Sequence, residues 1–105
     1  MAVGSSRRIR LDLNSPEFQD VFFRLEPSEL KQVVGSLRRL RDLDWNTLYH
    51  HTGFKWEALR HIRTPNGATT YSLRLSEKIR GIAYRDGDFL RIISLHPDHD
   101  SAYER

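Results

Sequence analysis

Hydrophobic and polar positions along the first half of the chain change from an alternating to a helical spacing. Ile9, Leu11 and Leu13 alternate with charged residues, which predicts a short strand with one buried face. Apolar residues then recur every three or four positions, which predicts two amphipathic helices. The first helix has the stripe Phe18, Val21, Phe22 and Leu25, and the second has Leu30, Val33, Val34, Leu37 and Leu40.

Capping residues mark the start of each helix. Asn14-Ser15-Pro16-Glu17 offers an N-cap, a proline in the first turn and an acid near the positive helix end. Pro27-Ser28-Glu29 restarts the pattern, so the two helices form a hairpin or a bent pair broken at Glu26-Pro27. The segment 44–51 is either one further helical turn or a loop, and Gly53 ends it.

The second half of the chain has β periodicity. Strands are predicted over residues 55–62, 69–75, 79–85 and 88–95, with turn signals between them, and Pro97 ends the last strand. This order predicts a single α+β domain over residues 1–105. Its N-terminal strand and two helices pack on one face of a twisted antiparallel sheet. Residues 1–7 are expected to form a flexible leader and residues 96–105 a functional tail.

Composition narrows the functional classes. The 105-residue chain is 38% hydrophobic and 30% charged, the balance of a globular domain, with neither a membrane-spanning run nor a secretory signal. It has no cysteine, which favours a reducing, cytoplasmic compartment. The net charge is +3, and all but three of the 17 basic residues are arginine. Arginine suits phosphate binding, although a GC-rich genome produces the same bias.

Hairpin pairing sorts the strand residues onto two faces. A three-residue turn at 76–78 places Arg74 opposite Arg80, and a two-residue turn at 86–87 places Arg80 opposite Ile93. The face expected beneath the helices is almost wholly apolar and carries Tyr71, Leu73, Leu75, Ile79, Gly81, Ala83, Leu90 and Ile92. The opposite face carries Ser72, Arg74, Arg80, Ile82, Tyr84, Phe89, Arg91, Ile93 and Leu95.

Three arginines converge on this second face: Arg74, Arg80 and Arg91. They repel one another unless an acid or a bound anion lies between them. The preceding strand brings Glu57 alongside, together with Lys55 and His61, so the face has the features of a phosphate site with acid–base groups. The alternative is a solvated face whose arginines pair with Glu57 and Glu77.

Three segments of this region share a pattern with a known family. They are Lys55-Trp56-Glu57-Ala58-Leu59-Arg60-His61, Tyr71-Ser72-Leu73-Arg74-Leu75 and Ile79-Arg80-Gly81-Ile82-Ala83-Tyr84. With the histidine-bearing tail, they resemble the RelE/ParE toxin superfamily, most closely its YoeB-type ribonucleases. The resemblance implies a toxin that cleaves mRNA on the ribosome without metal or other cofactor. It also implies a cognate antitoxin protein as partner.

The resemblance also implies roles for individual residues. Glu57 corresponds to the family's catalytic glutamate, Arg80 to its phosphate-binding arginine and Arg74 to an arginine on the preceding strand. Cleavage of RNA by its own 2′-hydroxyl needs a base, an acid and cations for the transition-state charge, and these residues suit the first and last needs. The predicted RNA contacts are Lys55, His61, Arg74, Tyr84, Arg91 and Tyr103.

The general acid stays open among three residues of the tail. The terminal residues of the family do not map cleanly onto this chain, where His96 and His99 flank Pro97-Asp98 and Tyr103 lies further on. Histidine is the preferred acid because imidazole titrates near neutral pH. Together, His96, Asp98 and His99 also have a second interpretation as metal ligands.

Other interpretations of the chain remain. A toxin of the same fold could act on DNA gyrase without catalysis, as in the ParE branch, or the chain could be an RNA- or ribosome-binding module. Trp45 and Trp56 are expected in the core or at an antitoxin contact, and Phe23 lies off the stripe of its helix and suggests a partner surface. His50-His51 is expected to be a solvated loop pair.

Overall fold

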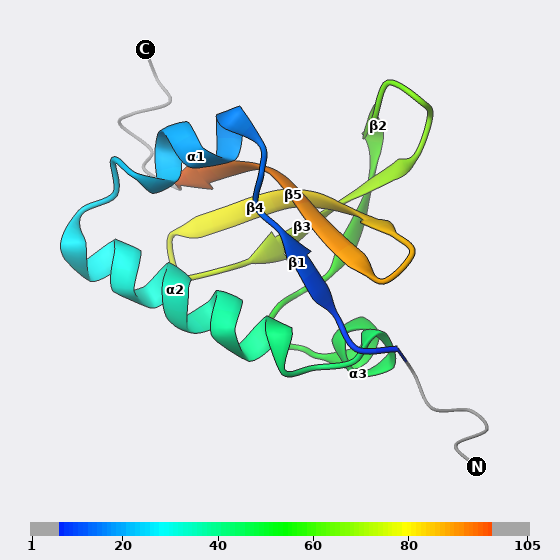
Figure 1. Ribbon diagram of the computed structural model, residues 1–105, viewed down its shortest axis with the longest axis horizontal. Coiled ribbons are helices and arrows are strands. Elements are labelled where there is room, and N and C mark those ends of the chain that lie inside the picture. Colours follow the sequence, from blue (N-terminus) through cyan, green and yellow to red (C-terminus); the bar gives the residue numbers. More distant parts are fainter. Residues whose placement is uncertain (1–6, 98–105) are drawn as a thin grey trace.

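A computed structural model describes residues 7–97, which form a five-stranded sheet with three helices (Figure 1). In chain order the elements are β1 (Arg10–Asp12), α1 (Pro16–Phe22), α2 (Pro27–Arg41), α3 (Trp45–His50), β2 (Glu57–Arg63), β3 (Thr69–Arg74), β4 (Ile79–Asp86) and β5 (Phe89–Pro97). The predicted α+β class is confirmed. Within the described range, no helix is long and apolar enough to cross a membrane.

The helices begin where capping chemistry predicts. The Ser15 hydroxyl accepts a hydrogen bond from the backbone N–H of Phe18, and prolines occupy the first turns of both α1 and α2. The segment 44–51, predicted to be either a helical turn or a loop, contains the helix α3. The Asp44 carboxylate caps this helix by accepting a 2.7 Å hydrogen bond from the Thr47 N–H. Backbone and side-chain hydrogen bonds from Thr47 lower the pKa of Asp44.

The strand order is β1-β5-β4-β3-β2, and one pairing differs from the expected antiparallel sheet. β1 is an edge strand of the sheet and runs parallel to β5, with Leu11 opposite Leu90, so the sheet is mixed. Strands joined by short turns must run antiparallel, whereas β1 and β5 are separated by almost the whole chain and are free of that constraint.

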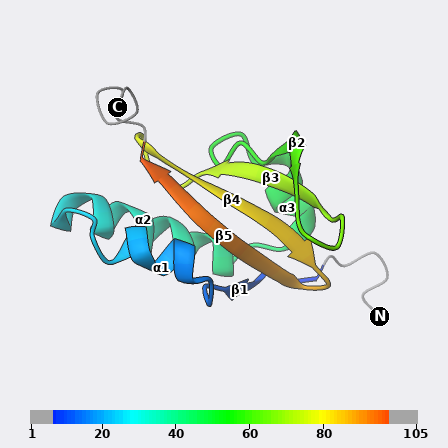
Figure 2. The same cartoon turned by 90° about the horizontal axis from the view of Figure 1, so that it is seen from above.

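The helices cover one face of the sheet. Figure 2 shows α1 and α2 on the same side of β4 and β5. The core beneath them is made of Ile9, Phe18, Val33, Leu37, Leu40, Trp45, Leu48, Phe54, Leu73, Leu75, Ile79, Ala83, Leu90, Ile92 and Leu95. The predicted apolar face is confirmed, with Tyr71 half-buried and its other members buried. Trp45 is 1% exposed, so of the two predicted places, the core and an antitoxin contact, it occupies the core.

The hairpin between β4 and β5 departs from its predicted register. Asp86 pairs with Phe89, so the turn is centred on Gly87 and Asp88 rather than on residues 86–87. Gly87 has a φ of 64°, and a glycine at the first central position is the requirement of a type II′ turn. The two central residues of the turn are therefore Gly87 and Asp88, and the prediction of Asp86 and Gly87 is wrong.

A β-bulge changes the pairing again further along β5. Ala83 pairs with Ile92 and Ile82 with Ser94, which leaves Ile93 as the extra residue. Beyond the bulge Arg80 lies opposite His96, so the predicted pairing of Arg80 with Ile93 is wrong.

Because of the bulge, one residue predicted for the polar face lies on the core face instead. Leu95 pairs with Gly81 and is 2% exposed, so it belongs to the core and not to the polar face. An extra residue reverses the face of every side chain that follows it in the strand, because side chains alternate.

Candidate active site

Two neighbouring rows of side chains cross the face of the sheet opposite α1 and α2. Register places Glu57, Ser72, Ile82 and Ser94 in one row across β2, β3, β4 and β5. The next row holds Arg74, Arg80 and His96. The predicted pairing of Arg74 with Arg80 is confirmed. Successive rows on one face are about 7 Å apart, so the long side chains of both rows can reach one phosphate group.

The position of His96 depends on the bulge at Ile93. Without the extra residue, Leu95 would occupy the open face and His96 would point into the core. The Ser15 hydroxyl donates a 2.6 Å hydrogen bond to the carbonyl oxygen of Ile93, which ties the N-cap of α1 to the bulged residue. The exposed His96 ring lies with its Nε2 2.9 Å from the Ser94 hydroxyl oxygen.

The position of Glu57 depends on the segment that enters β2. Lys55 has a φ of 51°, a left-handed conformation that is strained for a residue with a side chain. Trp56 then packs against the core, stacked on Tyr71 with ring centroids 4.4 Å apart. Its indole Nε1 is buried without a hydrogen-bond partner among residues 7–97. Because side chains alternate along a strand, burial of Trp56 leaves Glu57 exposed on the opposite face.

The charges of the two rows have no neutralising ion-pair partner among residues 7–97. Within the part of the chain that the structure describes, no ion pair involves Glu57, Arg74 or Arg80. Glu77 likewise forms no ion pair with these arginines. The alternative of a solvated face whose arginines pair with Glu57 and Glu77 is therefore not what the structure has. Two unpaired guanidinium groups directly opposite each other favour a bound anion.

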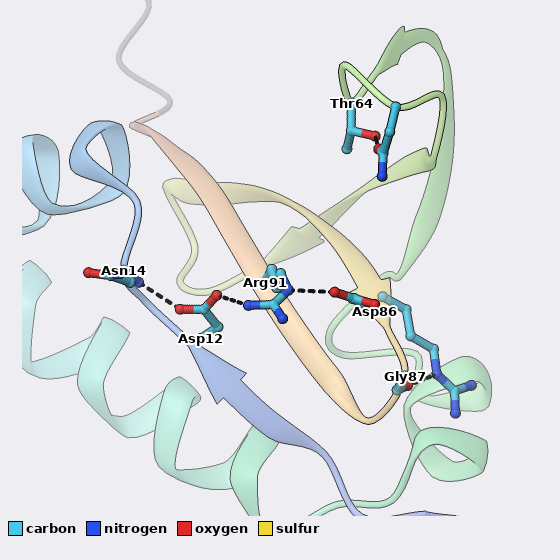
Figure 3. Close-up of polar contacts among 8 residues, drawn as sticks. Asp12, Asn14, Thr64, Asp86, Gly87 and Arg91 are labelled. Carbon is cyan, nitrogen blue, oxygen red and sulfur yellow. Dashed lines mark hydrogen bonds and ion pairs between the residues drawn. The ribbon is translucent and has the colours of Figure 1, made fainter.

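Arg91 lies at the other end of the same face and has a different environment. It forms ion pairs with Asp12 of β1 and, at 3.0 Å, with Asp86 of β4 (Figure 3). The hydrogen bond that Arg91 donates to Asp12, and then the one that it donates to Asp86, raise the pKa of Arg91. Asp12 also accepts from the backbone N–H of Asn14, so this cluster links β1, β5 and β4. Tyr84, a predicted RNA contact, lies opposite Arg91 and is half-buried.

The remaining predicted site residues lie at the margins. Lys55 follows Phe54, whose carbonyl accepts a 2.7 Å hydrogen bond from the Arg74 N–H, so Lys55 lies beside the arginine row. His61 lies on β2 in the stretch where the register with β3 shifts, on the side of Glu57 away from Arg74. The structure therefore does not bring His61 to the arginine row. His99 and Tyr103 lie outside the described residues.

Metal ligation has no candidate in the described part of the molecule. No group of three or more histidine, aspartate or glutamate residues between 7 and 97 could hold a metal ion. The interpretation that combines His96 with Asp98 and His99 involves residues outside that range.

Sequence reasoning missed an open groove of about 430 Å³ beside the arginine row. The groove lies between α2 and the end of β3 and is lined by Gln32, Ser36, Arg39, His51, Gly53, Phe54 and the segment from Arg74 to Glu77. Arg74 thus borders both the groove and the open face. His51 is exposed, as predicted, but its Nδ1 accepts hydrogen bonds from the N–H groups of Gly53 and Phe54 and orders the loop.

Comparison with known proteins assigns the fold. No protein-family model matches the chain, and no curated protein matches it by sequence. Among solved structures, an archaeal RelE–RelB complex from Pyrococcus horikoshii matches with a TM-score of 0.57 and 14% identity, over 90% of this chain and 97% of that chain. A copper-bound mutant toxin from Helicobacter pylori matches with a TM-score of 0.51 and 20% identity, over 90% and 99% of the two chains. The chain therefore has a RelE-like fold.

Proposed function

We propose that this protein is the toxin of a type II toxin–antitoxin system and a metal-independent endoribonuclease. Its substrate is mRNA, cut on the ribosome in the cytoplasm through attack of the RNA's own 2′-hydroxyl. One observation carries the proposal. Arg74, Arg80 and His96 form a row beside Glu57 on the open face, and the two arginines and the glutamate have no ion-pair partner among residues 7–97.

The proposed reaction needs one base and one acid. The Glu57 carboxylate takes the proton of the 2′-hydroxyl as the 2′-oxygen forms a bond to the adjacent phosphorus. The bond from phosphorus to the 5′-oxygen breaks, and a proton from His96 goes to that leaving oxygen. The products are a 2′,3′-cyclic phosphate and a free 5′-hydroxyl. Each positioned acid or base contributes about 10²- to 10⁴-fold in rate.

The arginines act on the charge that develops at phosphorus. Arg80 and Arg74 lie opposite each other across β3 and β4, so both guanidinium groups can bind the non-bridging oxygens of one phosphate. Lys55, Tyr84, Arg91 and His61 remain proposed contacts to the flanking RNA. His99 and Tyr103 remain proposed participants from the tail, with His99 an alternative to His96 as the acid.

The fold supports a protein partner as well. The archaeal RelE-like structure is a complex with RelB. By analogy, an acidic or amphipathic segment of a cognate antitoxin covers the face of Arg74, Arg80 and Arg91 and blocks access of RNA. Phe23, which is 74% exposed on α1's C-terminal side, is a second candidate contact for that antitoxin.

The decisive experiment maps mRNA ends by primer extension after translating ribosomes are incubated with the protein. Wild type is expected to produce new 5′ ends, and Glu57→Gln to produce at least about 100-fold fewer while its binding to ribosomes is unchanged. Arg80→Ala is expected to lower cleavage by about 10²- to 10³-fold, because it removes a cation that contacts the reacting phosphate.

Matched controls carry the same chemical changes away from the face. Glu17→Gln and Arg24→Ala alter exposed residues of α1 and its C-terminal flank, and both should cleave like wild type. Cleavage by Glu57→Gln at the wild-type rate would remove Glu57 from the mechanism. Absence of cleavage by wild type, with growth arrest on induction and inhibition of gyrase, would instead favour a ParE-like toxin. Binding to ribosomes without cleavage or growth arrest would indicate a binding module.

A further inference from the structure

We infer that the groove between α2 and the end of β3 binds the RNA strand next to the reacting phosphate, through contacts of Arg39 and His51 to a flanking phosphate group. This inference rests on the proposed function, because it extends the RNA path from the open face. The groove is an open concavity of about 430 Å³, which has room for a phosphate and its sugar.

Arg39 is the main cation of this groove and is held in place by contacts other than an ion pair. Its Nη2 donates a 3.0 Å hydrogen bond to the hydroxyl of Ser36, and its guanidinium carbon lies 5.9 Å from the centre of the Phe54 ring. Ser36 is 3% exposed and is itself fixed by donating to the carbonyl oxygen of Leu75. Between residues 7 and 97 no carboxylate forms an ion pair with Arg39. A pre-positioned, uncompensated guanidinium is suited to an anion.

His51 offers a second donor among the residues that line the groove. Its Nδ1 accepts from two backbone N–H groups, those of Gly53 at 3.1 Å and Phe54 at 3.3 Å. A ring nitrogen that accepts cannot carry the proton in the neutral ring, so the proton is on Nε2, which is then a donor. The ring also packs on Phe54, with centroids 4.8 Å apart, so the orientation of this donor is constrained.

Arg74 connects the groove to the active face. It lines the groove and also pairs with Arg80 in the arginine row, so one strand of RNA bound at Arg80 would pass Arg74 before it reaches Arg39. Glu77, at the rim, is the only acidic residue among the described lining residues, so the cations outnumber it. The excess of cations favours a ligand with several negative charges over a single acidic side chain. RNA is such a polyanion, and the neighbouring arginine row is already proposed to bind it.

The test measures binding of the full chain to a labelled 2′-O-methyl RNA, which cannot be cleaved by 2′-hydroxyl attack. Two probes are compared, one of about twelve nucleotides, long enough to follow an extended groove, and one dinucleotide that spans the reacting phosphate alone. The variants are Arg39→Gln, which keeps a polar group for Ser36, and Arg80→Gln. Arg38→Gln is the control, since Arg38 is exposed on the same helix and does not line the groove.

Arg39→Gln is expected to weaken binding of the long RNA about fivefold. It should also make the slope of log affinity against log salt shallower by about 0.7, the loss of one phosphate contact on a single strand. Binding of the dinucleotide should not change. Arg38→Gln should leave both probes within about twofold of wild type, and Arg80→Gln should weaken both probes.

Each other outcome overturns a defined part of the argument. If Arg39→Gln binds the long RNA like Arg38→Gln while Arg80→Gln is weak, the groove inference is wrong and the proposed active face stands. If Arg80→Gln binds both probes normally and Arg39→Gln loses the long RNA, the active face is wrong and the groove binds RNA by itself. If Arg39 is needed for binding of a polyglutamate peptide but not of RNA, the groove serves an acidic protein segment and the inference fails.

Discussion

Arginines lie at both ends of the open face, but the charged groups around them differ between the two ends. Arg91, at one end, is held by the carboxylates of Asp12 and Asp86. Arg74 and Arg80, at the other end, lie opposite each other without an ion-pair partner in the described residues. Both ends are made of neighbouring strands, so the difference comes from where carboxylates occur and not from the backbone.

This difference separates a structural role from a ligand-binding one. The pairs of Arg91 join the edge strand β1 to the hairpin of β4 and β5, which short turns alone do not do. Arg74 and Arg80 repel each other, which opposes folding, and a bound anion would relieve that repulsion. A cluster of like charges without an ion-pair partner among residues 7–97 therefore indicates a binding site more strongly than an arginine count does.

Among the changes that alter the contrast between the two ends, the largest effect is expected from placing a carboxylate near the unpaired arginines. Ser72→Asp introduces a carboxylate on the open face between Glu57 and Ile82, one row from both arginines. It should lower RNA cleavage about tenfold, because the arginines would be partly neutralised before RNA binds. Unfolding free energy should change by less than about 1 kcal/mol, the range of exposed ion pairs. Primer extension and urea unfolding measure the two effects.

The control for this change is Ser72→Asn, which has nearly the same shape and no charge. It should keep most of the cleavage activity of wild type. Equal losses in Ser72→Asp and Ser72→Asn would show that the space above Ser72 matters rather than the charge of the arginines.

A smaller effect is expected at the paired end. Arg91→Ala removes both ion pairs and leaves two carboxylates facing one another, so thermal unfolding should begin earlier and Tm should fall by a few degrees. Arg7→Ala, which removes a single pair with Asp88 from a side chain that is 74% exposed, should shift Tm much less. Cleavage by Arg91→Ala should exceed that by Arg80→Ala at a temperature where both are folded. The reverse order would mean that Arg91 serves RNA more than it serves the fold.

The smallest expected effect comes from partly releasing Arg91. Asp86→Asn removes one of its two carboxylates, so Arg91 gains some capacity to bind phosphate, and affinity for single-stranded RNA should rise about twofold. Asp20→Asn makes the same charge change on α1, where Asp20 pairs with Arg24, and should leave affinity unchanged. Equal increases in the two variants would show that net charge, and not the position of Arg91, controls binding.

Much of this comparison could be predicted from the sequence, because local signals were strong where turns were short. The three-residue turn at 76–78 correctly predicted Arg74 opposite Arg80. The N-cap and proline of α1 and the proline of α2 correctly predicted where these helices begin. The predicted hairpin turn of β4 and β5 was off by one residue because Asp-Gly and Gly-Asp are both present at residues 86–88. The observed pairing of Asp86 with Phe89 and the φ of Gly87 distinguish the two possible turns.

Features set by tertiary contacts could not be predicted. The bulge at Ile93 is stabilised by a hydrogen bond from Ser15, 78 residues away in sequence, and nothing in β5 itself signals it. The parallel pairing of β1 likewise depends on the packing of the whole chain. Arg39 and His51 line the same groove because of how α2 and the loop after α3 pack near the end of β3, and their spacing in sequence has no motif.

The extra residue in β5 also affects how this chain must be aligned with other proteins of its fold. A gapless alignment of β5 with a strand that lacks the bulge would shift every position from Ser94 onward by one. His96 would then be matched to a residue that points into the interior, and a core leucine would be matched to a residue of the open face. Residue equivalences in the C-terminal segment should therefore be taken from superposed strands, with a gap at Ile93.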